Sequence, residues 1–265
     1  MAITTLDQLI AAPSQRLTYV KTNTRTTVAA IPFSLFDLNG NPGAGTLAGS
    51  NTANGVVPTD ATAGYPVINA FGGGNTGYLN SVTFASSVAC RLTIFDCLFT
   101  AGAYSFNANT TLTSQPSYSS RVIGGTDFSN TELWIEAVTA FTGNQSIAIT
   151  YTNQDGTTGR TTGTVATGVA PTVGRMLQLP LQAGDTGVQK IESVVSTVSA
   201  AGTFNVHVFR RLWSGRVTSI NAGDTHDMLK TGLPQVFEDS ALRFVVNADA
   251  TSSGIPELQV EIVNG

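Results

Sequence analysis

Charged side chains are scarce in this sequence. Asp, Glu, Lys and Arg make up 11% of the 265 residues, against about 25% in a typical globular domain. The net charge is −4, and the thirteen basic residues are scattered, with only Arg210 and Arg211 adjacent. The sequence therefore lacks the basic patch of a nucleic-acid-binding protein. Because hydrophobic residues still make up 42%, it also lacks the composition of a disordered chain, and it suits a β-protein whose surface is largely covered by neighbours.

Long apolar runs are also absent. No stretch approaches the roughly 18 apolar residues of a membrane-spanning helix. The N-terminus has no basic region followed by an apolar stretch, so we expect no secretory signal. These two absences predict a soluble protein that is made in a cell's cytoplasm and has no membrane partner.

Only two cysteines are present, Cys90 and Cys97. They lie seven residues apart on one expected strand, and this odd spacing places their side chains on opposite faces. The same strand would hold them roughly 20 Å apart. We therefore predict two reduced, buried thiols rather than a disulfide.

Histidine is equally rare, because the sequence has only two, His207 and His226. His207 lies in the middle of an expected strand, and we interpret it as structural. His226 belongs to the run Asp224-Thr225-His226-Asp227, which could contribute to a metal site or an acid–base pair. Without a second histidine or a cysteine nearby, this is a weak set of ligands. We favour the alternative that Asp224 or Thr225 caps a short helix near residues 224–229.

The acidic residues form no clear active site. Glu132 and Glu136 would share one face of a strand, so a glycosidase pair is conceivable, but a solvated sheet face explains them equally well. Asp37, Asn39 and Asn41 resemble the start of a calcium loop, which then fails because Pro42 and Ala48 occupy its glycine and glutamate positions. No nucleophile elbow of the form GxSxG occurs. We predict no catalytic residue, no metal ligand, no cofactor and no enzymatic activity.

A repeat is the best supported feature. Arg91–Phe99 (RLTIFDCLF) matches Asn205–Trp213 (NVHVFRRLW), so that Phe95 corresponds to Phe209 and Phe99 to Trp213. Further matches run in the same order along the chain, at offsets of 109 to 114 residues; they are Gly74–Gly77 with Gly184–Gly187, Ser81-Val82 with Ser193-Val194, Leu133 with Leu242, and Ser146–Asn153 with Glu257–Asn264. This ordered series predicts two duplicated β modules of about 90 residues, although β-strands resemble one another by chance.

Short strands between Gly, Pro and Asn turns predict an all-β, antiparallel sandwich that resembles a jelly roll. The expected parts are an N-terminal arm with strands and a long loop at 1–62, a first β module at 63–156, a linker at 157–172 and a second β module at 173–265. The expected strands are 17–22, 26–38, 65–71, 78–84, 91–99, 132–141, 145–152, 176–181, 191–198, 204–213, 241–247 and 257–263. Thr5 could cap a short helix that Pro13 ends.

Two phrases carry a resemblance to a known family. Ile149–Arg160 (ITYTNQDGTTGR) and Thr231–Leu242 (TGLPQVFEDSAL) resemble virion proteins of tailed bacteriophages, above all the decoration, or cement, proteins that sit on a capsid shell. The resemblance covers about a tenth of the chain and contains no catalytic motif. It implies a β-rich and often trimeric protein that reinforces the lattice of the major capsid protein at the virion surface.

Two function classes stay open. The first is a capsid decoration protein, with itself and the major capsid protein as partners and with the polar segments 39–64, 100–131 and 214–240 as contact loops. The alternative is a tail-associated or receptor-binding module that holds a carbohydrate. In that module, the residues that could stack on sugar rings are Tyr65, Tyr78, Tyr104, Tyr118, Trp134 and Trp213. An exposed aromatic platform would favour the second class, and buried tryptophans would favour the first.

Overall fold

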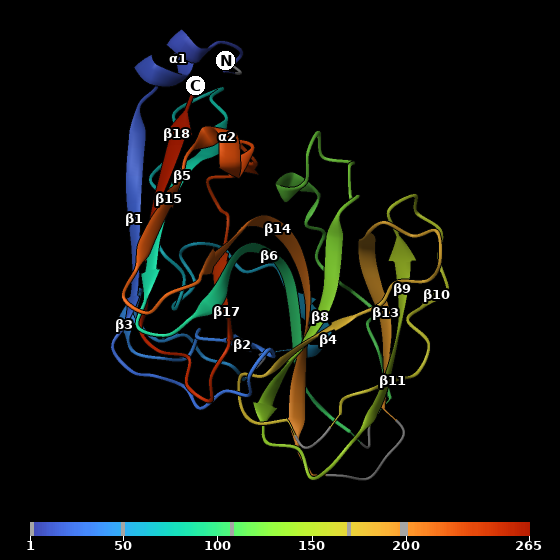
Figure 1. Ribbon diagram of the computed structural model, residues 1–265. Coiled ribbons are helices and arrows are strands. Elements are labelled where there is room, and N and C mark those ends of the chain that lie inside the picture. Colours follow the sequence, from blue (N-terminus) through green and yellow to red (C-terminus); the bar gives the residue numbers. More distant parts are fainter. Residues whose placement is uncertain (1–2, 49–50, 107–108, 169–170, 197–200) are drawn as a thin grey trace. The chain divides into compact units, whose positions relative to one another are not determined.

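The chain is all-β, as the sequence predicts. The computed structural model describes residues 3–48, 51–106, 109–168, 171–196 and 201–265, which form three antiparallel sheets and a few short helices (Figure 1). The elements up to residue 121 are α1 (Leu6–Ala11), β1 (Ser14–Lys21), β2 (Pro32–Ser34), β3 (Gly40–Asn41), β4 (Asn51–Val56), β5 (Gly77–Ser86), β6 (Cys90–Ser105), β7 (Thr110–Thr111) and the 3₁₀ helix η1 (Ser119–Arg121). The later elements are β8 (Thr131–Thr139), β9 (Ser146–Asn153), β10 (Arg160–Thr161), β11 (Val165–Ala166), β12 (Met176–Leu179), β13 (Val188–Ser196), β14 (Thr203–Val217), β15 (Gly223–His226), α2 (Met228–Thr231), β16 (Gln235–Val236), β17 (Leu242–Ala248) and β18 (Pro256–Asn264). Val198, the end of one expected strand, lies outside the described residues.

The chain divides into two compact units that do not follow the sequence modules. Unit 1 comprises Met1–Gly45, Thr59–Asp96 and Leu212–Gly265, and unit 2 comprises Thr46–Pro58 and Cys97–Arg211. The boundaries fall inside β6 and β14, so each of these long strands contributes to both units. Each unit takes strands from both expected modules, 63–156 and 173–265. That these two modules arose by duplication stays a prediction.

One sheet belongs wholly to unit 1 and one to unit 2. The unit 1 sheet has the order β15-β5-β18-β1-β3, with β16 also on β5. The unit 2 sheet has the order β10-β9-β13-β7, with β11 also on β9. The strands β10 and β11 lie in the expected linker 157–172 and pair with β9 after a tight turn. Gly156 adopts φ +81° in this turn, as the Asp155-Gly156 dipeptide predicts.

The third sheet has the order β12-β8-β14-β6-β17-β2, with β4 also on β6. Its long strands are buried on both faces, because every residue of Leu92–Phe99 and of Phe204–Arg210 is buried. Alternation alone would bury only every second residue. Residues of both parities are buried in these two runs, so both faces of the strands are covered.

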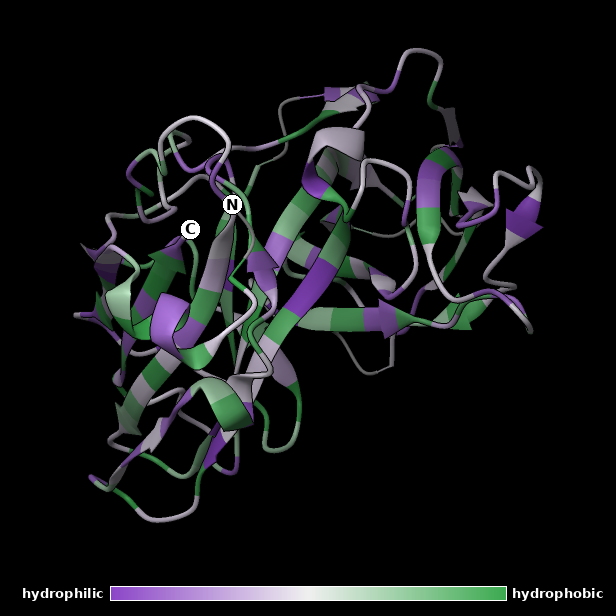
Figure 2. Cartoon of the chain, turned by 90° about the horizontal axis from the view of Figure 1, so that it is seen from above, coloured by the Kyte–Doolittle hydropathy of each residue, from purple (hydrophilic) through white to green (hydrophobic). Residues whose placement is uncertain are grey.

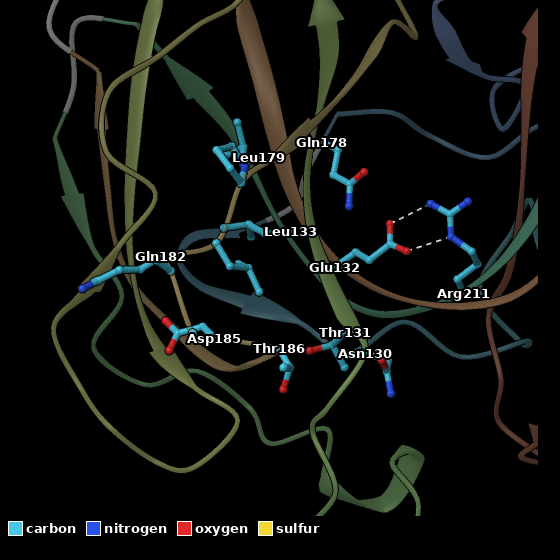
Figure 3. Close-up of a pocket in the computed structure, with 14 residues that line it drawn as sticks. Asn130, Thr131, Glu132, Leu133, Gln178, Leu179, Gln182, Asp185, Thr186 and Arg211 are labelled. Carbon is cyan, nitrogen blue, oxygen red and sulfur yellow. Dashed lines mark hydrogen bonds and ion pairs between the residues drawn. The ribbon is translucent and has the colours of Figure 1, made fainter.

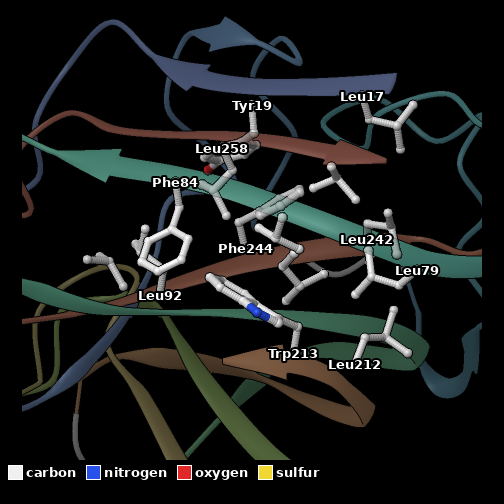
Figure 4. Packing of buried hydrophobic residues seen from close by; sticks show 14 of the residues in the cluster. Leu17, Tyr19, Leu79, Phe84, Leu92, Leu212, Trp213, Leu242, Phe244 and Leu258 are labelled. Atoms are coloured by element: carbon white, nitrogen blue, oxygen red, sulfur yellow. The ribbon is translucent and has the colours of Figure 1, made fainter. Parts of the chain in front are cut away.

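Each unit has its own hydrophobic core. In unit 1, side chains of β1, β5 and β18 meet those of β6, β17 and the end of β14 (Figure 4). Tyr19 stacks on Phe244 with ring centroids 4.1 Å apart, and Phe84 meets Trp213 edge-on at 4.9 Å. In unit 2, the core contains Phe204, Val206 and Val208 among others. Along the strands, hydrophobic green bands alternate with hydrophilic purple bands and with white bands of intermediate hydropathy (Figure 2).

The two unit-specific sheets share one irregularity. In the pairing of β18 with β5, Ser81 lies opposite Glu261 and Leu79 opposite Ile262, so Asn80 is the extra residue of a bulge. In the pairing of β13 with β9, Ser193 lies opposite Thr150 and Ile191 opposite Tyr151, so Glu192 is the extra residue. The bulge therefore immediately precedes the serine of each expected Ser-Val match, Ser81-Val82 and Ser193-Val194.

The long polar segments 39–64, 100–131 and 214–240 are only partly loops, because each contains short elements and some buried side chains. Segment 39–64 contains β3 and β4, and it packs closely because Gly45 and Gly64 have no side chain to meet the Phe36 ring. A Cβ atom there would lie 2.2 and 2.5 Å from that ring. Segments 100–131 and 214–240 extend β6 and β14 and contain further short elements, with Tyr104, Tyr118 and Phe128 buried in the first and Val236 in the second.

The N-terminal helix forms as predicted. Thr5 caps α1, and its side chain accepts a hydrogen bond from the backbone N–H of Gln8 while the Gln8 side chain accepts one from the Thr5 backbone N–H. This reciprocal capping box satisfies two N–H groups that would otherwise lack acceptors. The helix ends at Ala11, two residues before Pro13.

Candidate functional site

An open pocket of about 800 Å³ lies in unit 2 (Figure 3). It forms where the start of β8 meets the end of β12 and the loop that follows β12. Its lining combines a few leucines with amide, hydroxyl and charged groups. The lining residues are 130–133, 178–186 and Arg211.

A fixed ion pair marks one side of this pocket. Arg211 donates from Nε to Oε1 of Glu132 at 2.7 Å and from Nη2 to Oε2 at 3.0 Å. The indole Nε1 of Trp134 also donates to Oε2 of Glu132, at 2.8 Å. Glu132 lies opposite Phe209 in the pairing of β8 with β14, and its side chain is 17% exposed. Three hydrogen bonds therefore hold this carboxylate in one orientation at the pocket surface.

A second carboxylate anchors the loop on the other side. The guanidinium of Arg160 binds both oxygens of Asp185 at 2.9 Å, and Tyr151 Oη and Asn153 Nδ2 donate to the same carboxylate at 2.7 and 2.8 Å. The Arg160 hydrogen bonds are the main cause that lowers the pKa of Asp185 to about 2, and those from Asn153 and Tyr151 add to the effect against the opposing influence of burial. Burial is the main cause that raises the pKa of Tyr151 to about 12.

Backbone hydrogen bonds hold the same loop in place. The N–H of Gln182 donates to Tyr151 Oη at 2.7 Å, and the N–H groups of Thr186 and Gly187 donate to Oε1 of Gln154 at 2.9 and 3.1 Å. Gly187 also approaches the backbone closely, because a Cβ atom there would lie 1.9 Å from the Phe128 carbonyl oxygen. The pocket wall is thus preorganised.

This arrangement suits binding better than proton transfer. A carboxyl with a pKa of about 2 is fully ionised at neutral pH, so Asp185 cannot donate a proton. Glu132 is committed to Arg211 and Trp134. The exposed amides of Gln178 and Gln182, together with the Thr186 hydroxyl, can instead exchange hydrogen bonds with a neutral polar ligand.

Glu132 and Glu136 do share one face of β8, but only Glu132 reaches the pocket. Glu136 is fully buried, so the interpretation of a solvated face is wrong for this residue. Its Oε2 lies 3.0 Å from Nε2 of His207, which is also fully buried. The His207 ring stacks on Phe209 with centroids 5.1 Å apart. His207 therefore lies in the interior, as the structural interpretation expected.

His226 belongs to unit 1, whereas the residues that line the pocket belong to unit 2. Its Nδ1 accepts a hydrogen bond from Trp213 Nε1 at 3.0 Å, and its Nε2 lies 3.5 Å from Asp224. The expectation that Asp224 or Thr225 caps a helix is wrong, because both residues belong to β15, which pairs with β5. Asp227 caps α2 instead, and its carboxylate accepts the N–H groups of Leu229 and Lys230.

The other sequence candidates take structural positions. Cys90 and Cys97 are buried and form no disulfide, and burial raises the pKa of Cys90. Trp134 and Trp213 are 5% and 4% exposed, so both pack in the interior. Asp37, the start of the rejected calcium pattern, forms an ion pair with Arg25. Within the described parts of the chain, no group of three or more His, Cys, Asp or Glu residues could hold a metal ion.

No described helix has the length and apolar character needed to cross a membrane.

No family model matches the chain, and no curated protein matches it. Among solved structures, infectious bursal disease virus strain Gt is similar over 95% of this chain and 80% of its own, with 12% identity and a TM-score of 0.19. The T13 particle of the same virus is similar over 95% and 76%, with 11% identity and a TM-score of 0.19. Its VP2 subviral particle is similar over 96% and 80%, with 11% identity and a TM-score of 0.18. The chain thus has a weak likeness to viral capsid structures, and at these TM-scores the likeness carries no argument.

Proposed function

We propose that this chain is a non-enzymatic capsid decoration protein of a tailed bacteriophage, which binds the major capsid protein at the outer surface of the shell as a homotrimer. The phrases Ile149–Arg160 and Thr231–Leu242 support this proposal through their resemblance to virion proteins. In unit 2 the first phrase covers the end of β9 and the turn into β10. In unit 1 the second joins α2 to β17. Residues 155–159 of the first phrase and 238–239 of the second are exposed, whereas the parts in β9 and at the start of β17 are largely buried.

The distribution of charge carries the proposal. Six of the thirteen basic residues form ion pairs with carboxylates, namely Arg16, Arg25, Arg160, Arg211, Arg216 and Lys230. Four more are buried, namely Lys21, Arg121, Arg210 and Arg243. Ten of thirteen therefore have a carboxylate within 4 Å or are buried, and Arg16 is the most exposed of the paired ones. The remaining surface is rich in Thr, Ser, Asn and Gly, which suits many modest, wet contacts that act together on a repeating lattice.

We infer in addition that the two β modules arose by duplication and exchanged strands. In unit 1, β5 of the first module pairs with β18 of the second, and in unit 2, β13 of the second pairs with β9 of the first. The bulges at Asn80 and Glu192 occur at matching points of these two pairings. A shared bulge supports common descent, because a bulge is a specific feature of a fold rather than a consequence of β composition. Superposition of β5, β6, β17 and β18 on β13, β14, β8 and β9 tests this inference, and strands that fail to overlay in that order contradict it.

Shell binding tests the function. Purified protein is mixed with empty shells that lack decoration and is then sedimented, and the bound mass is measured against added protein. We expect saturation at a fixed number of copies per capsid subunit, and sedimentation equilibrium of the free protein should give a trimer. A linear, unsaturable signal, or no binding, would remove the proposal.

The pocket of unit 2 favours a second candidate, a carbohydrate-binding module of a tail or receptor-binding protein. Its amides and hydroxyls suit sugar hydroxyl groups. Against this candidate, none of the described residues that line the pocket is aromatic, although stacking on a ring face would ordinarily orient a sugar. Retention on a glycan array by a protein that binds no shell would favour this candidate. Loss of that retention in Gln178→Ala would place the glycan in this pocket.

A further inference from the structure

The sheet of unit 1 has an open edge along β1. Pro13 O accepts a hydrogen bond from the N–H of Asn264 on β18, and the register continues as Gln15–Ile262, Leu17–Val260 and Tyr19–Leu258. Because hydrogen bonding alternates along an antiparallel pair, the backbone groups of Ser14, Arg16 and Thr18 point away from β18. These three residues are exposed.

Only the far end of this edge is covered. Strand β3 pairs with β1 at Val20 and Lys21. Beyond them, the backbone N–H of Thr22 donates to the carbonyl oxygen of Asn39. Within the described parts of the chain, no hydrogen bond reaches the backbone groups of Ser14, Arg16 or Thr18. Native proteins usually protect such an edge with proline, bulges or several charges. The stretch from Ser14 to Thr18 has only one charge, that of Arg16.

Arg16 determines which strand fits this edge. Its side chain is 75% exposed, and its Nε lies 3.8 Å from Glu261 on β18. An added strand would place one residue directly opposite Arg16 on the same face. A second copy that used the whole open stretch in antiparallel pairing would place its own Arg16 there, and like charges at opposite positions are destabilising. An acidic residue on a different polypeptide is complementary.

A groove of mixed character adjoins the start of the edge. It has a volume of about 410 Å³, and apolar side chains of α1 (Leu6, Leu9 and Ile10) line it together with polar ones that include Asp227 and Glu261. Leu6 and Ile10 of α1 are 55% and 74% exposed. Because Ser14 and Arg16 project from the same face of β1, a residue opposite Ser14 would direct its side chain toward this groove.

We propose that the open edge of β1 binds an extended segment of another protein, which adds as a strand with an acidic residue opposite Arg16 and an apolar residue two positions away in the α1 groove. This is strand addition to a sheet edge, in which main-chain hydrogen bonds supply affinity and alternate side chains supply specificity. Only the identity of that protein as a shell subunit rests on the proposed function.

The test uses the full chain labelled with ¹⁵N and the peptide acetyl-Thr-Leu-Thr-Glu-Thr-Leu-Thr-amide, whose leucines flank the glutamate so that either strand direction can pair. We expect saturable shifts of the Ser14, Arg16 and Thr18 amide signals and slower hydrogen exchange at these amides. A control peptide with lysine in place of glutamate should bind at least five-fold more weakly. Because the probe is synthetic, its binding can succeed or fail independently of shell binding.

A matched pair of variants separates edge pairing from side-chain contact. Thr18→Pro removes an outward N–H while leaving the bonds of β1 to β18 intact, and proline is tolerated at such edge positions. Thr18→Val keeps the N–H. We expect Thr18→Pro to weaken peptide binding at least five-fold and Thr18→Val to change it less than two-fold. If Thr18→Pro lowers Tm strongly, Arg16→Glu replaces it and should reverse the preference between the two peptides.

Three results would overturn the proposal. They are equal binding by Thr18→Pro and the parent chain, peptide-induced shifts confined to another sheet edge, and a concentration-dependent dimer that protects the Arg16 and Thr18 amides without any peptide. The last result would assign the edge to a second copy.

Discussion

The buried pair of Glu136 and His207 offers the sharpest test of the interior of unit 2. Both side chains are fully buried, and their polar atoms lie 3.0 Å apart. Substitution His207→Ala removes a hydrogen-bond partner of the buried Glu136 side chain and leaves a cavity beside Phe209. Breaking a buried pair on one side costs about 3–5 kcal/mol in the free energy of unfolding. At about 2–4 °C per kcal/mol, Tm should fall by roughly 6–20 °C.

The double variant Glu136→Gln, His207→Gln separates the role of the ionisable groups from that of the hydrogen bond. It keeps two side chains that can hydrogen bond to each other and removes the buried ionisable groups, so it should be less destabilised than His207→Ala. Lys190→Ala, at an exposed position of the same unit, should stay within about 0.5 kcal/mol of the parent. Urea denaturation followed by fluorescence measures all three. A loss below about 1 kcal/mol for His207→Ala, or a double variant as unstable as the single one, would refute the reasoning.

Three further outcomes follow from individual side chains. Phe209→Ala should lower the free energy of unfolding by about 3–5 kcal/mol, since the ring is fully buried and its loss leaves a cavity; a loss under about 1 kcal/mol in urea denaturation would place the ring at the surface. Asp185 has its pKa lowered from 3.8 to about 2 in the folded chain, so the stability it contributes is present above about pH 4 and is lost as the pH falls toward 2. Acid titration of Asp185→Asn by circular dichroism should show a smaller loss over that interval than the parent, and identical profiles would contradict the role of Arg160. Cys90 and Cys97 should both react with a thiol reagent in denatured, unreduced protein and only slowly in native protein, and finding no free thiol after denaturation would contradict the structure.

The strands with clear hydrophobic periodicity could be predicted from the sequence. The expected strands 78–84, 91–99 and 204–213 lie within β5, β6 and β14. The observed strands are longer than the expected ones, because they continue into segments that contain Thr, Ser and Gly. Such segments have the local composition of loops. The tertiary pairing partners, rather than the local propensity, extend these strands.

The segment 65–71 was expected as a strand and is not one, although Tyr65, Ile68 and Phe71 are buried. Side-chain oxygens, rather than the backbone of a neighbouring strand, accept hydrogen bonds from its N–H groups. The N–H of Ile68 donates to Asp60 at 2.7 Å, and the N–H of Phe71 donates to Glu238 at 2.6 Å. Asp60 lies 8 residues from Ile68, and Glu238 lies 167 residues from Phe71. Hydrophobic periodicity could not indicate either contact.

The expected strand 26–38 is also mostly wrong. Only Pro32–Ser34 pairs, with β17. Ala30 has φ +61°, a left-handed conformation that interrupts an extended strand. The flanking residue Thr26 forms an isolated bridge to Ser252.

The candidate pocket could not be predicted for a different reason. Its ion pair joins Glu132 to Arg211 across two strands whose pairing depends on tertiary register. Its other wall depends on Arg160, which lies in a segment expected to be a linker. Sequence spacing did place Glu132 and Glu136 on one face, but only the pairing of β8 with β14 decides that the first reaches a pocket and the second is buried against His207.

The position of the protein on a particle tests the central claim most directly. Empty shells saturated with the purified chain are imaged by electron cryomicroscopy and averaged with icosahedral symmetry. We expect additional density of the size of a 265-residue chain at symmetry-related positions on the outer surface, clustered in threes and in contact with the major capsid protein. Shells that carry no additional density, while the same protein decorates isolated tails, would contradict it.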